Sequence, residues 1–500
     1  MNCFVVLFTF VFTNCLFASS DFENAPPDLM VMGKNLVFVD ILSARHEITY
    51  DGKSRTSRVS STISFQVKNG GHPVFDFSGN WISGVFINGE KSEFLSHSIA
   101  GVTQDANTRI RYLSTHVGPG VHTLTAQTQS TKNLQFSDLD EELVDKHGSD
   151  LAREDAASVR NAFFFSDLED RQFLEQYMVS NLEYDHHPIE FFVSLENLKR
   201  EHVIYTNGSL VEAAPNKFLI SYPDYFTSSS IYYHIAPKGA FPEEAMGVYR
   251  SIDGRDVLVR VYAAVGGETD KALSHALEMM AELESAYGEY PFAELLIYLT
   301  EGGGGMEYCG ATATSLWALS HEISHMYHAR SMMPKDGNAG WMDEAIASWR
   351  DANYEVVEEG ILEPVNLDRR GAYARTTSYQ SYTEGRNFIS FLAGLFDSKG
   401  RSLKSVLGDY YKKYIFQSVG TAVFRRELSS AFGEDLNSYF DKYTTRNALG
   451  KVMALRDKSG FEVFFPGRHH EAPDTMVVPQ KIKFNPYHPP LTKEQLRKML

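Results

Sequence analysis

The sequence predicts a multidomain protein in which an antiparallel β domain precedes an α+β, mostly helical domain. The chain has 500 residues, which exceeds the size of one ordinary domain. Short runs that alternate apolar and polar residues begin at Leu36 and continue to Ile235. At Pro242 the pattern changes to apolar residues at helical spacing, with strand-like runs between them. We therefore expect a β domain over residues 21–240 and a mostly helical domain over residues 241–450.

The first 20 residues are typical of a secretory signal peptide. Cys3–Phe12 is an apolar run, and Ala18-Ser19-Ser20 supplies small residues for cleavage before Asp21. This segment has no Lys or Arg, so an uncleaved membrane anchor is the alternative. After cleavage, Cys309 would remain of the three cysteines, and no intramolecular disulfide could form. Export without disulfides favours a bacterial periplasm or exterior.

Alternating runs and a turn signal predict the strands of the β domain. Ser61–Val67 and Trp81–Ile87 alternate, and Asn88-Gly89 after the second run is typical of a tight hairpin. Residues 138–155 are acidic and lack a clear period, which predicts a loop or a short helix. The alternation returns at Ile189–Val193. These observations indicate antiparallel strands on both sides of a long acidic connection.

Strands and helices are both predicted after residue 241. Val257–Tyr262 and Leu295–Leu299 are typical of strands, and Asp270–Tyr287 between them has apolar residues at helical spacing. Further helices are expected over residues 381–396, 403–416 and 436–449. Residues 451–500 predict a tail with one short helix, because Thr492-x-x-Gln495 forms a capping box.

The charge of the chain excludes some classes of partner. Its net charge is −17 and its pI is near 5.5. Nucleic acids and anionic membranes both bind clusters of Lys and Arg, so neither is expected as a partner. No internal apolar segment is long enough for a transmembrane helix, so we expect no stable membrane insertion after signal cleavage. The oligomeric state is left open.

The segment His321-Glu322-Ile323-Ser324-His325 carries the strongest chemical signal. Two histidines at i and i+4 of a helix project from one face, where both can bind one Zn²⁺. Glu322 is too near His321 to be the third ligand, and its expected role is that of general base for an attacking water. The alternative is a surface helix whose histidines face solvent. Ile323, Met326 and Trp317 favour a buried helix, in which unliganded His and Glu would cost roughly several kcal/mol.

Glu344 is the expected third zinc ligand. It follows His325 after eighteen residues, which is enough chain to finish one helix, turn through Pro334–Asn338 and begin a second helix. Two histidines and one glutamate leave a fourth position for water, which is the arrangement of a catalytic zinc site. The sequence therefore predicts one zinc ion per chain.

Three segments together resemble the M1 family of zinc aminopeptidases. The first is the H-E-x-x-H motif followed by eighteen residues and Glu344. The second, Gly304-Gly305-Met306-Glu307-Tyr308, is similar to the family's G-x-M-E-N motif. The third, Tyr382-Thr383-Glu384-Gly385, is similar to its Y-x-K-G segment. The resemblance implies a saddle-like N-terminal β domain and a thermolysin-like catalytic domain, in a short form without the family's large C-terminal helical domain.

The resemblance also implies roles for residues outside the zinc ligands. Tyr382 would stabilise the oxyanion, and Glu307 would bind the free α-ammonium of a peptide substrate. Gly305 and Met306 would bind the substrate backbone. Two positions depart from the family pattern, because Tyr308 and Asp343 stand where the family has asparagine. Cys309 is expected to be a small buried apolar residue rather than a ligand.

Two alternative functions stay open on the sequence. One is a zinc peptidase with a different cut, either an endopeptidase or a relative of glycyl aminopeptidases. The other is a non-catalytic binding protein on a peptidase fold. The intact set of His321, Glu322, His325 and Glu344 disfavours the second, because a binding protein has no chemical use for the Glu322 base.

Overall fold

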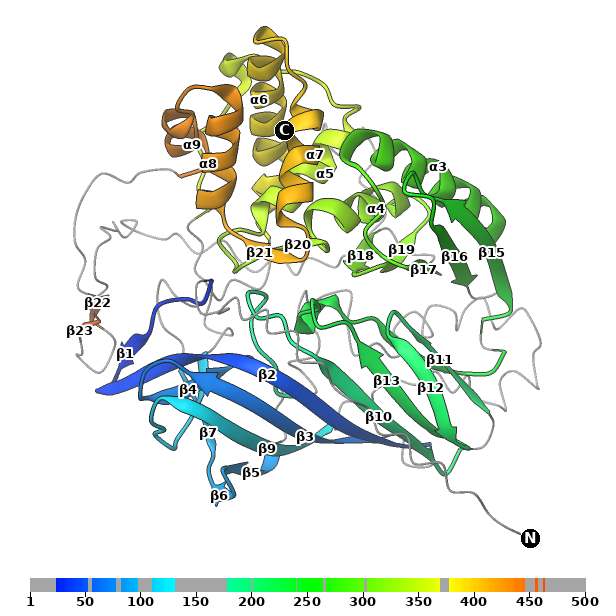
Figure 1. Cartoon of the computed structure of the whole chain (residues 1–500), viewed down its shortest axis with the longest axis vertical. Helices are drawn as coiled ribbons and strands as arrows, with labels where there is room; N and C mark the ends of the chain where they lie inside the picture. Colours follow the sequence, from blue (N-terminus) through cyan, green and yellow to red (C-terminus); the bar gives the residue numbers. More distant parts are fainter. Residues whose placement is uncertain are drawn as a thin grey trace, which may run out of the picture.

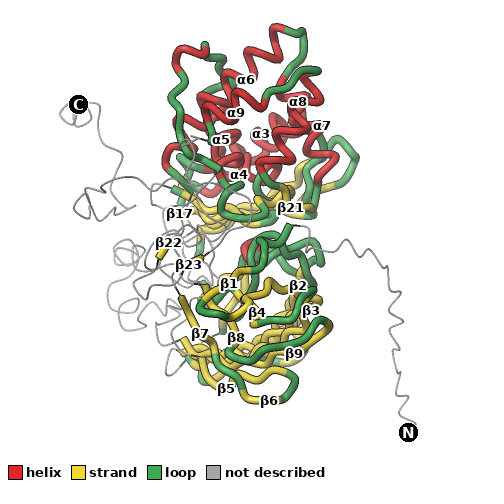
Figure 2. The backbone as a smooth tube through the Cα atoms, turned by 90° about the vertical axis from the view of Figure 1, so that its left-hand side faces the viewer, coloured by secondary structure: helices red, strands yellow, loops and turns green. Residues whose placement is uncertain are grey.

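The computed structural model describes residues 24–52, 56–77, 82–97, 110–130, 178–198, 201–239, 241–263, 267–300, 304–368, 377–445, 455–456 and 462–463. The predicted signal peptide, the acidic connection and the helix expected at Thr492 lie outside these residues. The large sheet of the N-terminal β region and the helices of the later part occupy opposite ends of the molecule (Figures 1 and 2). No described helix is both long and apolar enough to span a bilayer.

The N-terminal region is built on one large sheet. In the described part of the chain its central order is β12-β13-β10-β2-β3-β9-β5-β6, with β1, β4, β7 and β8 joined at its side. The strands are β1 Leu29–Val31, β2 Lys34–Asp51, β3 Thr56–Val67, β4 His72–Phe75, β5 Ile82–Ile87, β6 Glu90–Lys91, β7 Phe94–His97, β8 Ile110–Leu113, β9 Gly120–Ser130, β10 Ile189–Glu196, β12 Ser209–Ala214 and β13 Lys217–Tyr222.

This sheet is mixed, whereas the sequence predicted an antiparallel one. β10 runs parallel to β2, with Ile189 opposite Ala44, and β4 also runs parallel to β2. A parallel neighbour requires a long crossover, and the chain between Ser130 and Ile189 supplies one. The remaining pairs around β2, β3 and β9 are antiparallel, as the alternation indicated.

A short ribbon and a tight turn connect the large sheet to the helical half of the chain. β11 His202–Thr206 pairs with β14 Tyr233–Pro237, and the 3-10 turn η4 Ser228–Ser230 precedes β14. The side chains of η4 are buried. Ser229 links the turn to the helical half of the chain, because Arg330 donates to its carbonyl at 3.3 Å and to its Oγ at 3.2 Å. A second link stacks Tyr225 on Phe416 with ring centroids 3.9 Å apart.

The helical half begins with a five-stranded sheet in the order β15-β16-β17-β19-β18. β16, β17 and β19 are mutually parallel, and the antiparallel strands β15 and β18 form the two edges. Helices α3 and α4 pack against this sheet (Figure 1). The bounds are β15 Glu243–Arg250, β16 Asp256–Ala263, α3 Thr269–Tyr287, β17 Glu294–Thr300, β18 Gly305–Tyr308, β19 Ala311–Ser315 and α4 Leu319–His328.

The remaining helices form a bundle next to α4. The apolar core joins α5 to α6 and α9, since the Phe388 ring contacts both Trp341 and Phe440. The bounds are β20 Met332–Pro334, α5 Trp341–Asp351, η5 Glu359–Ile361, η6 Ser381–Gly385, α6 Arg386–Ser398, α7 Leu403–Tyr414, β21 Gln417–Val419, α8 Thr421–Phe432, α9 Asn437–Tyr443, β22 Leu455–Arg456 and β23 Glu462–Val463.

The expected helices are present with shifted ends. The helix predicted from residue 381 begins as a π turn, η6, before it becomes α6. The connection from the first zinc-site helix to the second contains a short strand that the sequence did not indicate, β20, which pairs with β21. This pairing fixes the loop between α4 and α5, and so fixes where α5 starts.

Candidate metal centre

Helix α4 places two histidines side by side. His321 and His325 lie one turn apart, and their ring centroids are 4.7 Å from each other. His325 is buried, and the His321 side chain is 17% exposed. The apolar face of α4, which includes Ile323 and Met326, packs into the core. The rest of the helix is thereby held with its imidazoles toward α5.

Helix α5 brings a carboxylate to both imidazoles. The Glu344 Oε2 atom lies 3.1 Å from His321 Nε2 and 3.4 Å from His325 Nε2. In a tetrahedral zinc site with ligands at 2.0–2.1 Å from the ion, neighbouring ligand atoms are about 3.3 Å apart. These two distances match that spacing, and all three ligand atoms lie within 4.8 Å of one another, so the three residues could hold one metal ion. Against the effect of burial, His325 and His321 hold the pKa of Glu344 well below its usual range.

A second carboxylate orients His321 from behind. The Nδ1–H of His321 donates to Asp351 Oδ2 at 2.6 Å, which leaves Nε2 facing Glu344. Arg350 contacts Asp351 at 3.4 Å and Glu282 at 2.7 Å. The sequence analysis missed Asp351, although an acid seven residues after Glu344 on one helix lies on the same face.

The Glu322 carboxyl lies beside the candidate metal ligands. Its side chain is buried, and its Oε2 atom has no hydrogen-bond partner among the described residues. Burial and then repulsion from Glu307 raise the pKa of Glu322 to about 8, and the nearby histidines oppose this rise. A bound dication would lower that pKa again. An unpaired carboxyl at this position can accept a proton from a substrate or a water.

The edge strand β18 lies directly over Glu322. A side chain at Gly305 would place its Cβ 2.5 Å from Glu322 Cγ, so this position requires glycine. The Met306 side chain packs in a core cluster with Tyr232 and Tyr308. Among the described residues, the backbone of β18 pairs only with β19, so β18 is an edge strand of the sheet.

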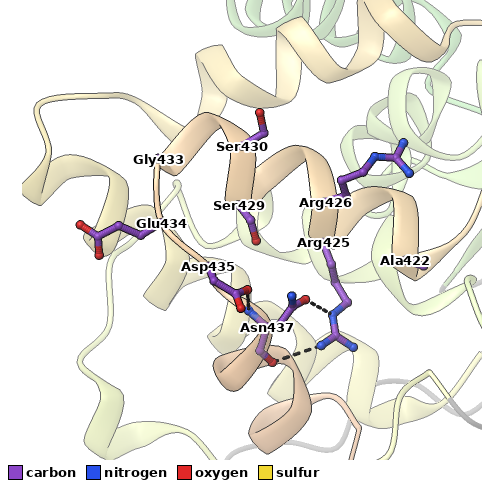
Figure 3. Close-up of a pocket in the computed structure, with 9 residues that line it drawn as sticks. All are labelled: Ala422, Arg425, Arg426, Ser429, Ser430, Gly433, Glu434, Asp435 and Asn437. Atoms are coloured by element: carbon purple, nitrogen blue, oxygen red, sulfur yellow. Dashed lines mark hydrogen bonds between the residues drawn. The ribbon is translucent and has the colours of Figure 1, made fainter.

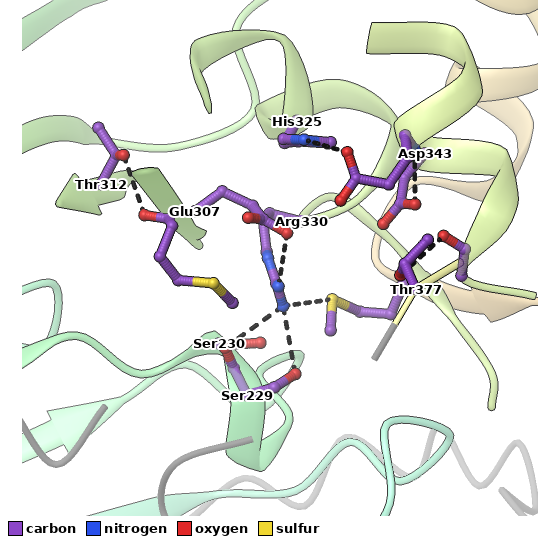
Figure 4. A network of polar contacts seen from close by, with 12 residues as sticks. Ser229, Ser230, Glu307, Thr312, His325, Arg330, Asp343 and Thr377 are labelled. Atoms are coloured by element: carbon purple, nitrogen blue, oxygen red, sulfur yellow. Dashed lines mark hydrogen bonds and ion pairs between the residues drawn. The ribbon is translucent and has the colours of Figure 1, made fainter. Parts of the chain in front are cut away.

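Glu307 approaches the metal centre from β18. One of its carboxylate oxygens, a Glu322 oxygen and a His325 nitrogen all lie within 4.8 Å of one another. The partner of Glu307 is Arg330, which the sequence did not indicate. Arg330 donates to Glu307 Oε1 at 2.8 Å (Figure 4). Cys309 is buried, and its thiol donates to the Arg330 carbonyl at 3.1 Å. The Cys309 thiol therefore bonds to the backbone, and Cys309 does not belong to the group of candidate metal ligands.

The π turn η6 carries Tyr382 to the carboxylate. The Tyr382 hydroxyl donates to Glu344 Oε1 at 2.6 Å, and its ring stacks on His321 with centroids 5.9 Å apart. Gly385 allows this approach, since a Cβ there would lie 3.0 Å from the Ala345 Cβ. π turns inside helices occur frequently at functional sites. Asp343, also buried, accepts from the Glu344 backbone N–H at 2.6 Å.

The structure thus brings six of the residues singled out in the sequence to one place. They are His321, Glu322, His325, Glu344, Glu307 and Tyr382. His186 is not near this group, because it bonds to the Tyr225 carbonyl and to Ser418 Oγ.

A surface groove beside α8 has no such chemistry (Figure 3). Arg425 in its wall bonds to Asn437 and Asp441. Arg426 bonds to Glu427 and to the Tyr414 hydroxyl. Both guanidinium groups are therefore held by neighbouring side chains of α7, α8 and α9.

No protein-family model and no curated protein matches the sequence. Solved structures do match the fold. An M1 zinc metallopeptidase from Deinococcus radiodurans has 11% identity and a TM-score of 0.55, over 82% of this chain and 95% of that one. Yeast LTA4 hydrolase in complex with bestatin has 12% identity and a TM-score of 0.56, over 83% and 69%. Legionella pneumophila aminopeptidase A has 12% identity and a TM-score of 0.56, over 81% and 49%. The chain therefore has the fold of these M1 zinc metallopeptidases.

Asp351→Asn should weaken zinc binding 10–100-fold, because the amide no longer orients and polarises His321. The measurement is competition with a chelator of known affinity. Asp409→Asn, at an exposed position on α7, is the matched control and should bind zinc as the parent chain does. Unchanged zinc affinity in Asp351→Asn would show that this carboxylate does not support the ligand.

Glu322→Gln should stabilise the metal-free chain at high pH. The folded pKa near 8 lies above the unfolded value near 4.5, so the contribution of Glu322 is present below pH 4.5 and is lost as the pH rises through 8. The stability of Glu322→Gln relative to wild type should therefore rise by more than about 1 kcal/mol between pH 5 and pH 9. Denaturant unfolding in a chelator measures this, with the exposed Glu278→Gln as control. A flat difference would contradict the raised pKa.

Proposed function

We propose that this protein is a zinc-dependent peptidase that removes N-terminal residues from peptides. The observation that carries the proposal is the convergence of His321, His325 and Glu344 within ligand distance, with the carboxyl of Glu322 beside them. The fold shared with M1 zinc metallopeptidases supports it. One of the similar structures, also from Deinococcus radiodurans, holds a Tyr-Ser-Ala substrate, which supports peptides as the substrate class.

His321, His325 and Glu344 would hold the zinc ion. The chemistry that zinc supplies when bound is polarisation of the scissile carbonyl and a lower pKa for water. Glu322 takes the proton of the attacking water at its unpaired Oε2 and later gives it to the leaving amine. Gly305 leaves room for this carboxyl, and the close cover of β18 keeps bulk water away from it.

Tyr382 is proposed to stabilise the negative charge that develops on the carbonyl oxygen. Its hydroxyl donates to Glu344 in the substrate-free chain and needs only a small turn to donate to an oxyanion at the metal centre. Stacking on His321 limits the motion of the ring to such a turn. The free edge of β18 would pair with the substrate backbone and align the scissile bond.

A second candidate is a zinc peptidase whose cut does not require a free α-amine. One observation favours it, namely the ion pair between Glu307 and Arg330, with side chains 5% and 1% exposed. The carboxylate expected to bind a substrate ammonium already has a cation within the chain. Both candidates use the same zinc ligands, base and tyrosine.

Glu322→Gln should keep zinc and lose turnover by about 10²–10⁴-fold, because the amide cannot accept the proton of water. Metal analysis and hydrolysis of a peptide library, read by product mass, measure the two properties together. Glu278→Gln on the exposed face of α3 is the matched control and should keep both. Full turnover by Glu322→Gln would remove the proposed mechanism. Retained peptide binding without turnover in wild type would favour a non-catalytic binding protein.

Tyr382→Phe should lower kcat about 10²–10³-fold with little change in KM, since the lost hydrogen bond forms mainly in the transition state. Tyr379→Phe is the matched control, because Tyr379 lies on the same segment and is 77% exposed. Equal effects of the two substitutions would count against an oxyanion role for Tyr382.

A further inference from the structure

A buried guanidinium occupies the space between Glu307 and the β region. Arg330 donates from one terminal nitrogen to Glu307 Oε1 at 2.8 Å. The other terminal nitrogen donates to the Ser229 carbonyl at 3.3 Å and to Ser229 Oγ at 3.2 Å. Figure 4 shows Arg330 extended between β18 and η4. The guanidinium is therefore held from two sides, by the strand β18 and by the turn η4 of the β region.

Arg330 remains charged in this position. A guanidinium is not deprotonated in proteins, and the Arg330 side chain is 1% exposed. A buried cation needs a buried anion, and Glu307, 5% exposed, is the carboxylate that it contacts. The charge of Glu307 is thus compensated before any substrate arrives.

This pairing changes what Glu307 can offer to a substrate. A lone buried carboxylate would attract an α-ammonium and would reject a substrate that lacks one, because the carboxylate would then stay uncompensated. With Arg330 in place, a substrate without that charge leaves no anion unpaired. A substrate with the charge gains less, because the guanidinium repels it at short range.

We propose that Arg330 replaces the substrate's α-ammonium as the counter-ion of Glu307 and so sets the substrate class. The inference rests on the proposed peptidase function and refines it. Peptides whose first group carries no positive charge, such as an acyl group or a lactam formed by the first residue, bind as well as peptides with a free amine. Arg330 acts here as a positioning residue, through Glu307.

The test compares two peptides that differ only in the amine. Alanyl and propionyl forms of one peptide have the same length and nearly the same volume, so steric exclusion affects both alike. Binding is measured by calorimetry on the zinc-loaded chain with Glu322→Gln, in which hydrolysis is stopped. We expect the two dissociation constants to agree within about threefold. A preference for the alanyl peptide above about tenfold would overturn the proposal, because it would show that Glu307 still selects an ammonium.

Removing the Arg330 cation should create a preference for the peptide with a free α-amine. Adding Arg330→Met to the same background should make the alanyl peptide bind about tenfold or more tightly than the propionyl peptide. Arg330→Lys keeps a cation and should restore equal binding. Glu307→Gln combined with Arg330→Met removes both charges and should also bind the two peptides equally. An unchanged ratio in Arg330→Met would overturn the proposal.

Folding and function are separated by two further readouts. Circular dichroism and thermal unfolding identify a variant that has lost its fold. If Arg330→Met does not fold, the test uses Arg330→Lys and the double variant Glu307→Gln with Arg330→Met. A purely structural role for Arg330 predicts that the double variant also loses its fold. Failure of every folded variant to bind either peptide counts against the proposal. Turnover by the chain with Glu322 intact tests the peptidase function independently.

Discussion

The burial of Glu344 against two imidazoles is the constraint on which the site depends. A buried carboxylate is costly unless charge and hydrogen bonds compensate it. Here His321 and His325 contact its Oε2 atom, and the Tyr382 hydroxyl donates to its Oε1 atom. The packing of α5 against α4 and η6 brings these groups together, so the same contacts that bury the carboxylate also assemble a set of zinc ligands.

The β region completes the site from the opposite side. Its η4 turn holds Arg330, and Arg330 in turn holds Glu307 on the edge strand β18. Glu307 is therefore held by contacts between the two halves of the chain. The similar solved structures have 11–12% identity and share only the fold with this protein. The ion pair of Arg330 with Glu307 is an observation on this chain itself.

The grouping of His321, His325 and Glu344 could be predicted from the sequence because its geometry is local. Helical spacing places His321 and His325 on one face, and the eighteen-residue interval allows a second helix to supply Glu344. The parallel pairing of β2 with β10 could not be predicted, since a long connection separates them and periodicity carries no information on strand direction. Arg330 was missed for a related reason, because its partners Glu307 and Ser229 are set by tertiary packing.

X-ray absorption spectroscopy at the zinc edge tests the central claim most directly. If His321, His325 and Glu344 share one ion, the spectrum of the zinc-loaded chain should show about four nitrogen or oxygen neighbours near 2.0–2.1 Å. The outer-shell scattering should correspond to two imidazoles. Sulfur near 2.3 Å, a six-oxygen shell or the absence of imidazole scattering would contradict the account.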